Sequence, residues 1–406
     1  MKVVQINGGV FGSTGKIMFG IADLCKQYGY EMICASPITT TNKDKEPNGE
    51  YIKIGSFNSR RINVLLDMVT GKTNGFAKKE TRELLKRLEE YKPDIIHLHN
   101  IHGSYINLDM LFGYIKSNKI KTVWTLHDCW SFTGHCTHFD MIGCDKWKSG
   151  CFDCPQYKTY PKSIFDNSKK QYQKKKDMFL GVDDLTIVTP SKWLGDLAKQ
   201  GFLGKYPVEV INNGIDLDVF KPTESNFREK YNCQDKLIIL GVAFGWGYAK
   251  GLDAFVELSK RLDERFQIVL VGTDDSVDAT LPSNIISIHR TTNQQELAEI
   301  YSASDLFVNT TRQENFPTVN IESLACGTPV LTFKTGGSPE IIDNTCGDVV
   351  EKNDIDALEN KIKSILENKT YTKDACIKRA AQYEYKNKFE SYIRLYERIY
   401  KGQASQ

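Results

Sequence analysis

The chain has 406 residues, of which 40% are hydrophobic and 26% are charged, a composition that suits a soluble protein of about two domains. Its formal net charge of +2 gives no general reason to expect a nucleic-acid partner, and no run of about 18 apolar residues is present to span a bilayer. The N-terminus leads directly into a predicted strand, without the basic segment and apolar stretch of a signal peptide, so we expect a cytoplasmic protein.

The predicted elements follow the same rhythm in both halves of the chain. Short β-branched runs alternate with helical or loop stretches: MKVVQIN, YEMICAS, DIIHLHN, KTVWTLHD and LTIVTPS, then LIILGVA, FQIVLVG, IISIH, DLFVNTT and PVLTF. The turn-rich stretch VEVINNGIDLDVFKP between them is typical of a hinge. This pattern predicts an α/β protein with two Rossmann-like domains, residues 1–215 and 216–385, facing each other across a cleft. We expect a C-terminal helix over 386–406 to pack back on the N-terminal domain.

Residues 8–17, GGVFGSTGKI, follow the first predicted strand. An ATP-binding P-loop fails here, because Val10 and Ile17 occupy the positions of a required glycine and of the magnesium-binding hydroxyl. The remaining glycines allow a tight turn, and Ser13 or Thr14 is placed to cap the helix that follows. A strand, a glycine turn and a helix N-terminus favour an anion, but a simple crossover that needs small residues gives the same pattern.

Polar residues gather where the predicted strands end. In open α/β sheets ligands bind beyond the carboxyl ends of the strands, so this placement predicts a binding cleft. The residues concerned are Gly8, Gly9, His99, Asn100, His127 and Asp128 in the first half, and Gly245, Arg312 and Glu314 in the second. His97 and His99 lie along one strand, and we expect one to face the core and the other the cleft.

The most specific stretch is TTRQENFPTVNIESLACGTPVLTFKTGGSPEII. Pro317 suits an early helical position, so the amides near Thr318 and Val319 would point into the cleft and bind phosphate. The carboxylates of Glu314 and Glu322 would hold sugar and ribose hydroxyls. Taken alone, Glu322 is typical of a solvated helix face.

This stretch resembles the retaining GT-B glycosyltransferases of glycosyltransferase family four. Glu314 and Glu322 match the family's E-x7-E element, which is followed by ACGTPV and the glycine turn TGGSPEII. The hinge NNGIDLDVFKP and the stretch TPSKWL are similar to the family as well, and the resemblance covers essentially the whole chain. The cysteine-rich insertion at 129–161 resembles that of bacterial members that build surface polysaccharides.

The resemblance implies a role for each matching residue. Glu314 would hold donor-sugar hydroxyls near the reacting carbon, and Glu322 would bind the nucleotide ribose. Lys250, in YAKGLDAF, would neutralise the donor diphosphate, and His127 would contact the sugar and the developing charge. No enzymatic nucleophile or catalytic metal is implied, and charge stabilisation would do most of the catalysis in a front-face displacement.

The chain departs from the family at Gly245, which occupies the position of a common arginine, and Arg312 is the candidate to replace it. The implied donor site also includes Gly8, Gly9, Phe316, Pro317, Thr318 and Val319, and the implied acceptor side consists of Lys16, His99, Asn100 and Asp128.

The function implied is transfer of a hexose from a nucleotide-diphosphate sugar to a glycan or lipid-linked glycan in polysaccharide biosynthesis, with UDP slightly favoured over GDP. A sugar-nucleotide 2-epimerase and a non-enzymatic nucleotide-sugar sensor are the alternatives. If the acceptor is lipid-linked, the basic run Lys169–Lys176 would hold the N-terminal domain against anionic headgroups at the inner face of the membrane. A solvated helix face explains the same run.

Five of the eleven cysteines fall within residues 129–154. Four of them offer thiolate ligands, and the last two have the spacing of a zinc knuckle, so we predict one structural zinc. The predicted ligands are Cys136, Cys144, Cys151 and Cys154, with His135 and His138 as substitutes. Free thiols are the alternative, and disulfides rank last in a reducing compartment.

Overall fold

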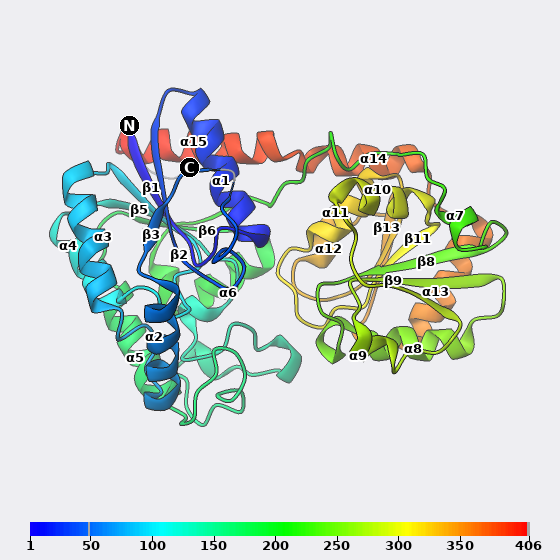
Figure 1. The fold of residues 1–406 in the computed structure, drawn as a ribbon, viewed down its shortest axis with the longest axis horizontal. Helices are drawn as coiled ribbons and strands as arrows, with labels where there is room; N and C mark the ends of the chain where they lie inside the picture. Colours follow the sequence, from blue (N-terminus) through cyan, green and yellow to red (C-terminus); the bar gives the residue numbers. More distant parts are fainter. Residues whose placement is uncertain (48, 404–406) are drawn as a thin grey trace. The chain divides into compact units, whose positions relative to one another are not determined.

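The computed structural model describes residues 1–47 and 49–403 and divides the chain into two compact units (Figure 1). The first unit comprises Met1–Ile211 together with Phe389–Gln406, and the second comprises Asn212–Lys388. Each unit has its own parallel sheet and its own hydrophobic core. The predicted α/β architecture with two Rossmann-like domains is therefore confirmed.

The first unit is built on a seven-stranded parallel sheet with the order β3-β2-β1-β4-β5-β6-β7. The strands are β1 (Lys2–Ile6), β2 (Glu31–Pro37), β3 (Ile52–Ile54), β4 (Ile95–Leu98), β5 (Lys121–Thr125), β6 (Leu185–Thr189) and β7 (Val208–Val210). All four residues of the central β4 are buried, which explains why its sequence IIHL lacks polar alternation. The strand order reverses between β1 and β4, where ligands bind in sheets of this kind.

Helices cover both faces of this sheet (Figure 1). They are α1 (Gly12–Gln27), α2 (Phe57–Thr70), α3 (Lys78–Tyr91), α4 (Leu108–Ser117), α5 (Ser168–Phe179) and α6 (Lys192–Gln200). Side-chain caps fix several of the starts, with Ser56 before α2, Asn107 before α4 and Ser191 before α6. Among the described residues, no helix is both long and apolar enough to cross a membrane.

The predicted cap of α1 is wrong. The helix already starts at Gly12, so Ser13 and Thr14 lie inside its first turn, and the residue before it makes no side-chain cap. Thr14 Oγ1 instead accepts a hydrogen bond from Asn7 Nδ2 at 3.1 Å. The first turn of α1 is therefore attached to the end of β1.

The last helix, α15 (Tyr385–Tyr400), belongs to the first unit from Phe389 onward, as predicted. Its side chains Tyr392 and Tyr396 are buried and reach polar atoms of the central strands. Tyr396 OH lies 2.5 Å from His97 Nδ1, and Tyr392 OH lies 3.2 Å from Thr125 Oγ1. These contacts fix α15 against β4 and β5.

The second unit has a six-stranded parallel sheet with the order β10-β9-β8-β11-β12-β13, which again reverses beside the first strand. The strands are β8 (Leu237–Val242), β9 (Phe266–Val271), β10 (Ile285–Ile288), β11 (Leu306–Asn309), β12 (Val330–Phe333) and β13 (Gly347–Val350). The helices are α7 (Phe227–Lys230), α8 (Leu252–Arg261), α9 (Asp275–Asp278), α10 (Gln294–Ala303), α11 (Thr318–Ala325), α12 (Ser338–Ile341), α13 (Ile355–Asn368) and α14 (Lys373–Ala380). Two clusters of buried side chains form its core.

All ten strands predicted from the sequence are present, and the sequence pattern fails to indicate three others, β3, β7 and β13. Each of these three lies at an edge of its sheet. Edge strands pair on one side only, and these have three or four residues each. A short run with one paired side gives too little periodicity to distinguish it from a turn, and β7 indeed lies in the stretch predicted as a hinge.

Candidate functional site

Three neighbouring strands of the second unit end in loops that carry the most specific predicted residues. β11 pairs with β8 on one side and with β12 on the other, all in parallel. Lys250 lies in the loop after β8, Glu314 in the loop after β11, and Gly336 in the loop after β12. Because the carboxyl ends of parallel strands meet at one edge of the sheet, residues far apart in the chain come together here.

Lys250 and Glu314 form an ion pair, with Nζ 3.1 Å from Oε2. The lysine side chain is 33% exposed and the glutamate side chain 23%, so a ligand has access to both. Hydrogen bonds fasten the two loops: Arg312 N donates to Ala249 O at 2.9 Å, and Thr310 Oγ1 donates to Lys250 O at 3.2 Å. The pair is therefore held by the main chain as well as by its own charges.

The glycine turn after β12 supports Glu314 directly. Gly336 has a φ of +55°, and a Cβ at this position would lie only 1.9 Å from Glu314 O. Gly337 N donates to Asn315 O at 2.8 Å. Only glycine combines this backbone conformation with so close an approach, which explains the first glycine of the TGG sequence.

Helix α11 begins beside this turn. Pro317 precedes it and provides no side-chain cap. The backbone amides of Thr318 and Val319 can therefore donate hydrogen bonds to an anion, as the first amides of a helix commonly do. Glu322 is half-buried, and Tyr301 OH donates to its Oε2 at 3.4 Å, so it is more than a solvated surface residue. Phe316, expected at the donor site, is instead buried in the core of the unit.

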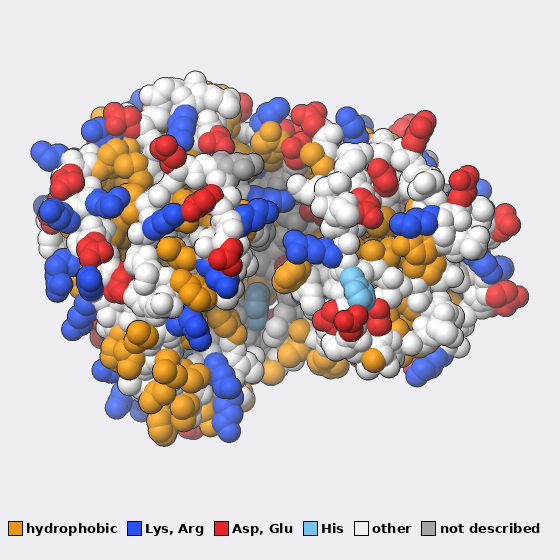
Figure 2. Space-filling view, viewed as in Figure 1, with side chains coloured by type: hydrophobic (Ala, Val, Ile, Leu, Met, Phe, Trp, Pro, Cys, Tyr) orange, Lys and Arg blue, Asp and Glu red, His pale blue; other side chains and the backbone are white. Residues whose placement is uncertain are grey.

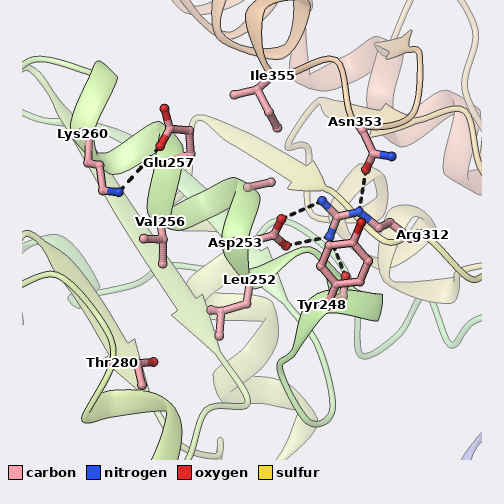
Figure 3. Close-up of a pocket in the computed structure, with 11 residues that line it drawn as sticks. Tyr248, Leu252, Asp253, Val256, Glu257, Lys260, Thr280, Arg312, Asn353 and Ile355 are labelled. Atoms are coloured by element: carbon pink, nitrogen blue, oxygen red, sulfur yellow. Dashed lines mark hydrogen bonds and ion pairs between the residues drawn. The ribbon is translucent and has the colours of Figure 1, made fainter.

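The guanidinium of Arg312 binds other residues of the second unit. This does not favour the expectation that it replaces the arginine common at the position of Gly245. Its side chain is 4% exposed, and its guanidinium donates to both carboxylate oxygens of Asp253, at 2.6 and 2.9 Å. It also donates to Asn353 Oδ1 at 2.5 Å and to Tyr248 O at 2.6 Å (Figure 3). A pocket of about 840 Å³ lies beside this network, but none of Lys250, Glu314 and Glu322 lines it. Arg312 therefore fastens α8 to its surroundings.

Three histidines of the first unit are in contact at the ends of β4 and β5: His97 lies within β4, His99 follows it, and His127 follows β5. The rings of His97 and His99 lie 4.0 Å apart, and His99 Nδ1 lies 3.1 Å from His127 Nε2. The expectation that His97 and His99 face opposite sides is wrong, because side chains two residues apart point to the same side of a strand. Burial lowers the pKa of all three, that of His127 to about 4, and neighbouring histidines lower those of His97 and His99 further. All three are neutral at pH 7.

The hydrogen bonds around His99 fix the tautomers of two of these rings. Gln5 Nε2 donates to Met18 O at 2.8 Å, so Gln5 Oε1 must accept from His99 Nε2–H at 2.9 Å. The neutral His99 then has no proton on Nδ1, which accepts from His127 Nε2–H. His127 Nδ1 is therefore an acceptor nitrogen.

A second polar group surrounds the predicted residue Asp128. Its carboxylate lies 2.8 Å from His102 Nε2 and accepts from Trp130 N at 2.8 Å, and His102 Nδ1 lies 3.0 Å from Tyr160 OH. Burial alone would raise the pKa of Asp128, but the charge and hydrogen bond of His102 outweigh it and the pKa lies below its ordinary value. His102 and Tyr160 were not predicted, and the second histidine of HNIHG is the one sequence signal for them.

The buried Asn7 joins the glycine turn after β1 to the segment after β4. Its Nδ2 donates to Gly9 O at 2.8 Å, and its Oδ1 accepts from Asn100 N at 3.3 Å. A Cβ on Gly8 would lie 3.0 Å from Asn100 O, which explains the first glycine. Lys16, predicted on the acceptor side, is exposed on α1.

The predicted zinc ligands do not form a metal site as the structure places them. Within the described parts of the chain, no group of three or more histidine, cysteine, aspartate or glutamate side chains could hold a metal ion. Burial raises the pKa of Cys136 to about 12, with a smaller contribution from Cys154 and Cys151, so these thiols do lie near one another. Cys151 Sγ accepts from Gly134 N at 3.1 Å. The structural zinc stays a prediction.

The run Lys169–Lys176 is not one free basic face. Lys175 is buried, its Nζ donates to Trp130 O at 2.7 Å, and burial lowers its pKa to about 7. Lys174 pairs with Asp109 at 2.6 Å. Two of the five lysines in the run are therefore committed inside the unit, which weakens the predicted membrane contact through it.

The hydrogen bonds that run from Gln5 through His99 to His127, called the histidine relay from here on, yield a first testable prediction. Gln5→Met removes the acceptor for His99 Nε2–H in a fully buried position, so the free energy of unfolding should fall by about 1–3 kcal/mol. Chemical denaturation measures this change, and ¹⁵N NMR should show a shifted tautomer of His127. Gln173→Met, on the exposed side of α5, is the matched control. Equal effects of the two substitutions would contradict the relay.

A second prediction concerns acid. Because the pKa of His127 is lowered to about 4, the unfolded chain binds more protons than the folded chain between pH 6.5 and 4, and stability falls as the pH falls through this range. Between pH 7 and 5 this group should cost the wild type up to about 2 kcal/mol. His127→Gln should lose less stability over the same interval, as urea titrations at the two pH values would show. The control His289→Gln, whose imidazole has a pKa raised by Asp278, should not reduce the loss.

The two units match two known domain families. Residues 29–219 match the model described as Glycosyltransferase Family 4, and residues 223–385 match the model described as Glycosyl transferases group 1. The chain is 27% identical over 271 residues to the colanic acid biosynthesis glycosyl transferase WcaC of Escherichia coli, covering 65% of each chain. It is also 27% identical over 203 residues to N,N'-diacetylbacillosaminyl-diphospho-undecaprenol alpha-1,3-N-acetylgalactosaminyltransferase of Campylobacter jejuni, covering 47% of this chain and 54% of the relative.

The matched parts thus span about two thirds and about half of the lengths of these two relatives. Among solved structures, HepE from Anabaena in complex with UDP-glucose has a TM-score of 0.66 at 13% identity, covering 98% of this chain and 99% of that one. This likeness extends over both units. The chain therefore has the two-domain GT-B fold, with a part that matches the Family 4 model followed by a part that matches the group 1 model.

Proposed function

We propose that the chain is a retaining glycosyltransferase that moves a hexose from a nucleotide-diphosphate sugar to a lipid-linked glycan in polysaccharide biosynthesis. The observation that carries the proposal is the pair Lys250 and Glu314, 3.1 Å apart and accessible, beside the start of α11. A cation next to a carboxylate matches a ligand whose diphosphate is adjacent to sugar hydroxyls. The UDP-glucose bound to HepE supports a UDP-sugar donor, and the diphospho-undecaprenol substrate of the Campylobacter jejuni relative supports an undecaprenol-linked acceptor.

In this proposal the second unit binds the donor. The Lys250 ammonium breaks its ion pair with Glu314 and neutralises the diphosphate instead. The amides of Thr318 and Val319 donate to the phosphate oxygens. The Glu314 carboxylate then accepts hydrogen bonds from the sugar hydroxyls. Glu322 accepts hydrogen bonds from the ribose. All these groups lie within one unit, at the ends of β8 and β11.

The chemical step needs no group beyond these and the acceptor. The bond between the anomeric carbon and the diphosphate oxygen breaks, and the acceptor hydroxyl oxygen bonds to the same face of that carbon. The hydroxyl proton passes to the departing diphosphate, whose charge the lysine and the helix N-terminus stabilise. His127, with Nε2–H donated to His99, would use Nδ1 to accept a hydrogen bond from a sugar hydroxyl.

Product analysis tests the proposal. The purified chain is incubated with a panel of labelled UDP- and GDP-sugars and an undecaprenyl-diphosphate glycan, and the new linkage is analysed by NMR. We expect one donor to give a product with the anomeric configuration of the donor. An inverted linkage would contradict retention, a free 2-epimer would identify an epimerase, and tight donor binding without turnover would identify a sensor.

The proposal that the second unit alone binds the nucleotide gives a further prediction. Glu322→Ala should weaken binding of the cognate nucleotide diphosphate by about 1–3 kcal/mol, because hydrogen bonds to a charged group are lost. Gly9→Val, in the other unit, should abolish most transfer and leave nucleotide affinity largely unchanged. Calorimetric titration and transfer assays on both variants check this. If both variants lose nucleotide affinity equally, the units do not divide the work in this way.

A further inference from the structure

Helix α2 is inverted relative to an ordinary surface helix. Such helices bury an apolar stripe and expose polar residues. In α2 the two buried positions are polar, Asn63 at 8% and Asp67 at 7% exposure. The exposed large side chains are hydrophobic: Ile62 at 58%, Val64 at 41%, Leu65 at 54%, Leu66 at 38% and Val69 at 44%. Packing within the first unit does not explain these hydrophobic side chains.

Polar contacts attach the buried side of α2 to the unit. The Asp67 carboxylate accepts from Asn74 N at 2.8 Å and from Gly75 N at 3.4 Å. Asn74 in turn donates to Ile101 O at 2.5 Å and accepts from Ser104 N at 2.6 Å. The helix is thereby held with its polar side inward, and its hydrophobic side chains face solvent.

The exposed hydrophobic side chains form a continuous surface with a neighbouring loop. Ile62, Leu65, Leu66 and Val69 follow the spacing i, i+3, i+4, i+7 and so share one side of the helix. Ile164 N donates to Met68 O at 3.0 Å, which places Ile164 and Phe165, 48% and 62% exposed, beside that helix. We call these residues the docking face: Ile62, Leu65, Leu66, Val69, Ile164 and Phe165.

The charges along the docking face are mostly basic. Residues 57–72 contain three basic residues, Arg60, Arg61 and Lys72, and one acidic residue, the buried Asp67. Residues 155–165 contain two lysines and no acidic residue, and the carboxylate of the next residue, Asp166, accepts from Cys154 N and Ser168 N. Figure 2 shows hydrophobic side chains gathered over the end of the first unit where α2 lies in Figure 1, with Lys and Arg beside them.

We infer that the docking face binds the surface of an anionic lipid bilayer. Hydrophobic side chains on one side of a helix, bordered by arginine and lysine, suit the boundary between headgroups and acyl chains. A second copy of the chain fits this face less well, because a symmetric contact would bring one basic border against the other. The partner identified by this chemistry is therefore lipid, with α2 lying in the interface plane.

The position of the docking face suits delivery of an acceptor. The adjoining loop carries Tyr160, which is 58% exposed and whose OH lies 3.0 Å from His102 Nδ1. His102 binds Asp128 at 2.8 Å, so the face borders polar residues predicted on the acceptor side. A glycan linked to a lipid in that bilayer would reach these residues without leaving the membrane surface. This last step rests on the proposed function, but docking itself does not.

Co-sedimentation of the full chain with phosphatidylcholine vesicles, with and without phosphatidylglycerol and without any donor, tests the inference. We expect binding to the anionic vesicles. The double substitution Leu65→Ser and Leu66→Ser should weaken it by roughly tenfold or more, since each leucine loses its burial in lipid. Arg61→Gln with Lys72→Gln should weaken binding roughly fivefold per charge on anionic vesicles.

Two controls make the outcome specific. Tyr400→Ser removes an exposed aromatic side chain from α15, and Lys169→Gln with Lys170→Gln neutralises two exposed lysines of α5; both should bind vesicles like the wild type. The fluorescence of the tryptophan introduced by Leu66→Trp should be quenched by brominated acyl chains. This quenching reports insertion of α2 into the bilayer even if the serine variants fold poorly.

Three results would overturn the inference: equal vesicle binding by the leucine and Tyr400 variants, no quenching of Leu66→Trp, or a dimer that the leucine substitutions dissociate. A chain that transfers sugar to a soluble acceptor but ignores vesicles would contradict docking and leave the proposed function intact. A chain that binds vesicles through the docking face but transfers no sugar would support docking and contradict the proposed function.

Discussion

Parallel strand pairing is the constraint on which both candidate site clusters depend. In the second unit, β11 pairs with β8 at Leu306 with Ile239 and Phe307 with Leu240. This register brings Lys250 and Glu314, 64 residues apart in the chain, within 3.1 Å of each other. A slip of one residue would turn every side chain of β11 to the other face of the sheet, so the hydrophobic pattern of the strand also specifies the site.

The two units use the same topology for different electrostatics. At the end of β8 and β11 the groups are charged, paired and open to solvent, which suits a ligand that carries its own charge. At the end of β4 and β5 the histidines are crowded and neutral, because burial lowers the pKa of each ring. A neutral imidazole with a fixed tautomer distinguishes donors from acceptors, which suits the recognition of hydroxyl groups.

The sequence predicted what depends on local pattern and missed what depends on packing. Ten of the strands, the glycine turns and the pair of glutamates were visible because each has a periodicity or a motif. The edge strands were too short to show one. The relay through Gln5, His99 and His127 joins three strand ends, and only the assembled sheet shows that Gln5 lies within 2.9 Å of His99. The contacts of Arg312 were missed for the same reason, since its partner Asp253 lies 59 residues away.

Helix α2 shows why a sequence pattern leaves the direction of a helix open. An apolar stripe indicates that one side of a helix avoids water, but it does not say what replaces the water. In α2 the deciding residue is Asp67: its carboxylate accepts hydrogen bonds from two backbone N–H groups of the loop after the helix, one of them the amide of the buried Asn74. Turning the apolar stripe inward would break these hydrogen bonds, because the Asp67 carboxylate would then point into solvent. The hydrogen bonds of one loop therefore determine that the leucines of α2 face outward, and the environment that accepts those leucines must be supplied from outside the unit.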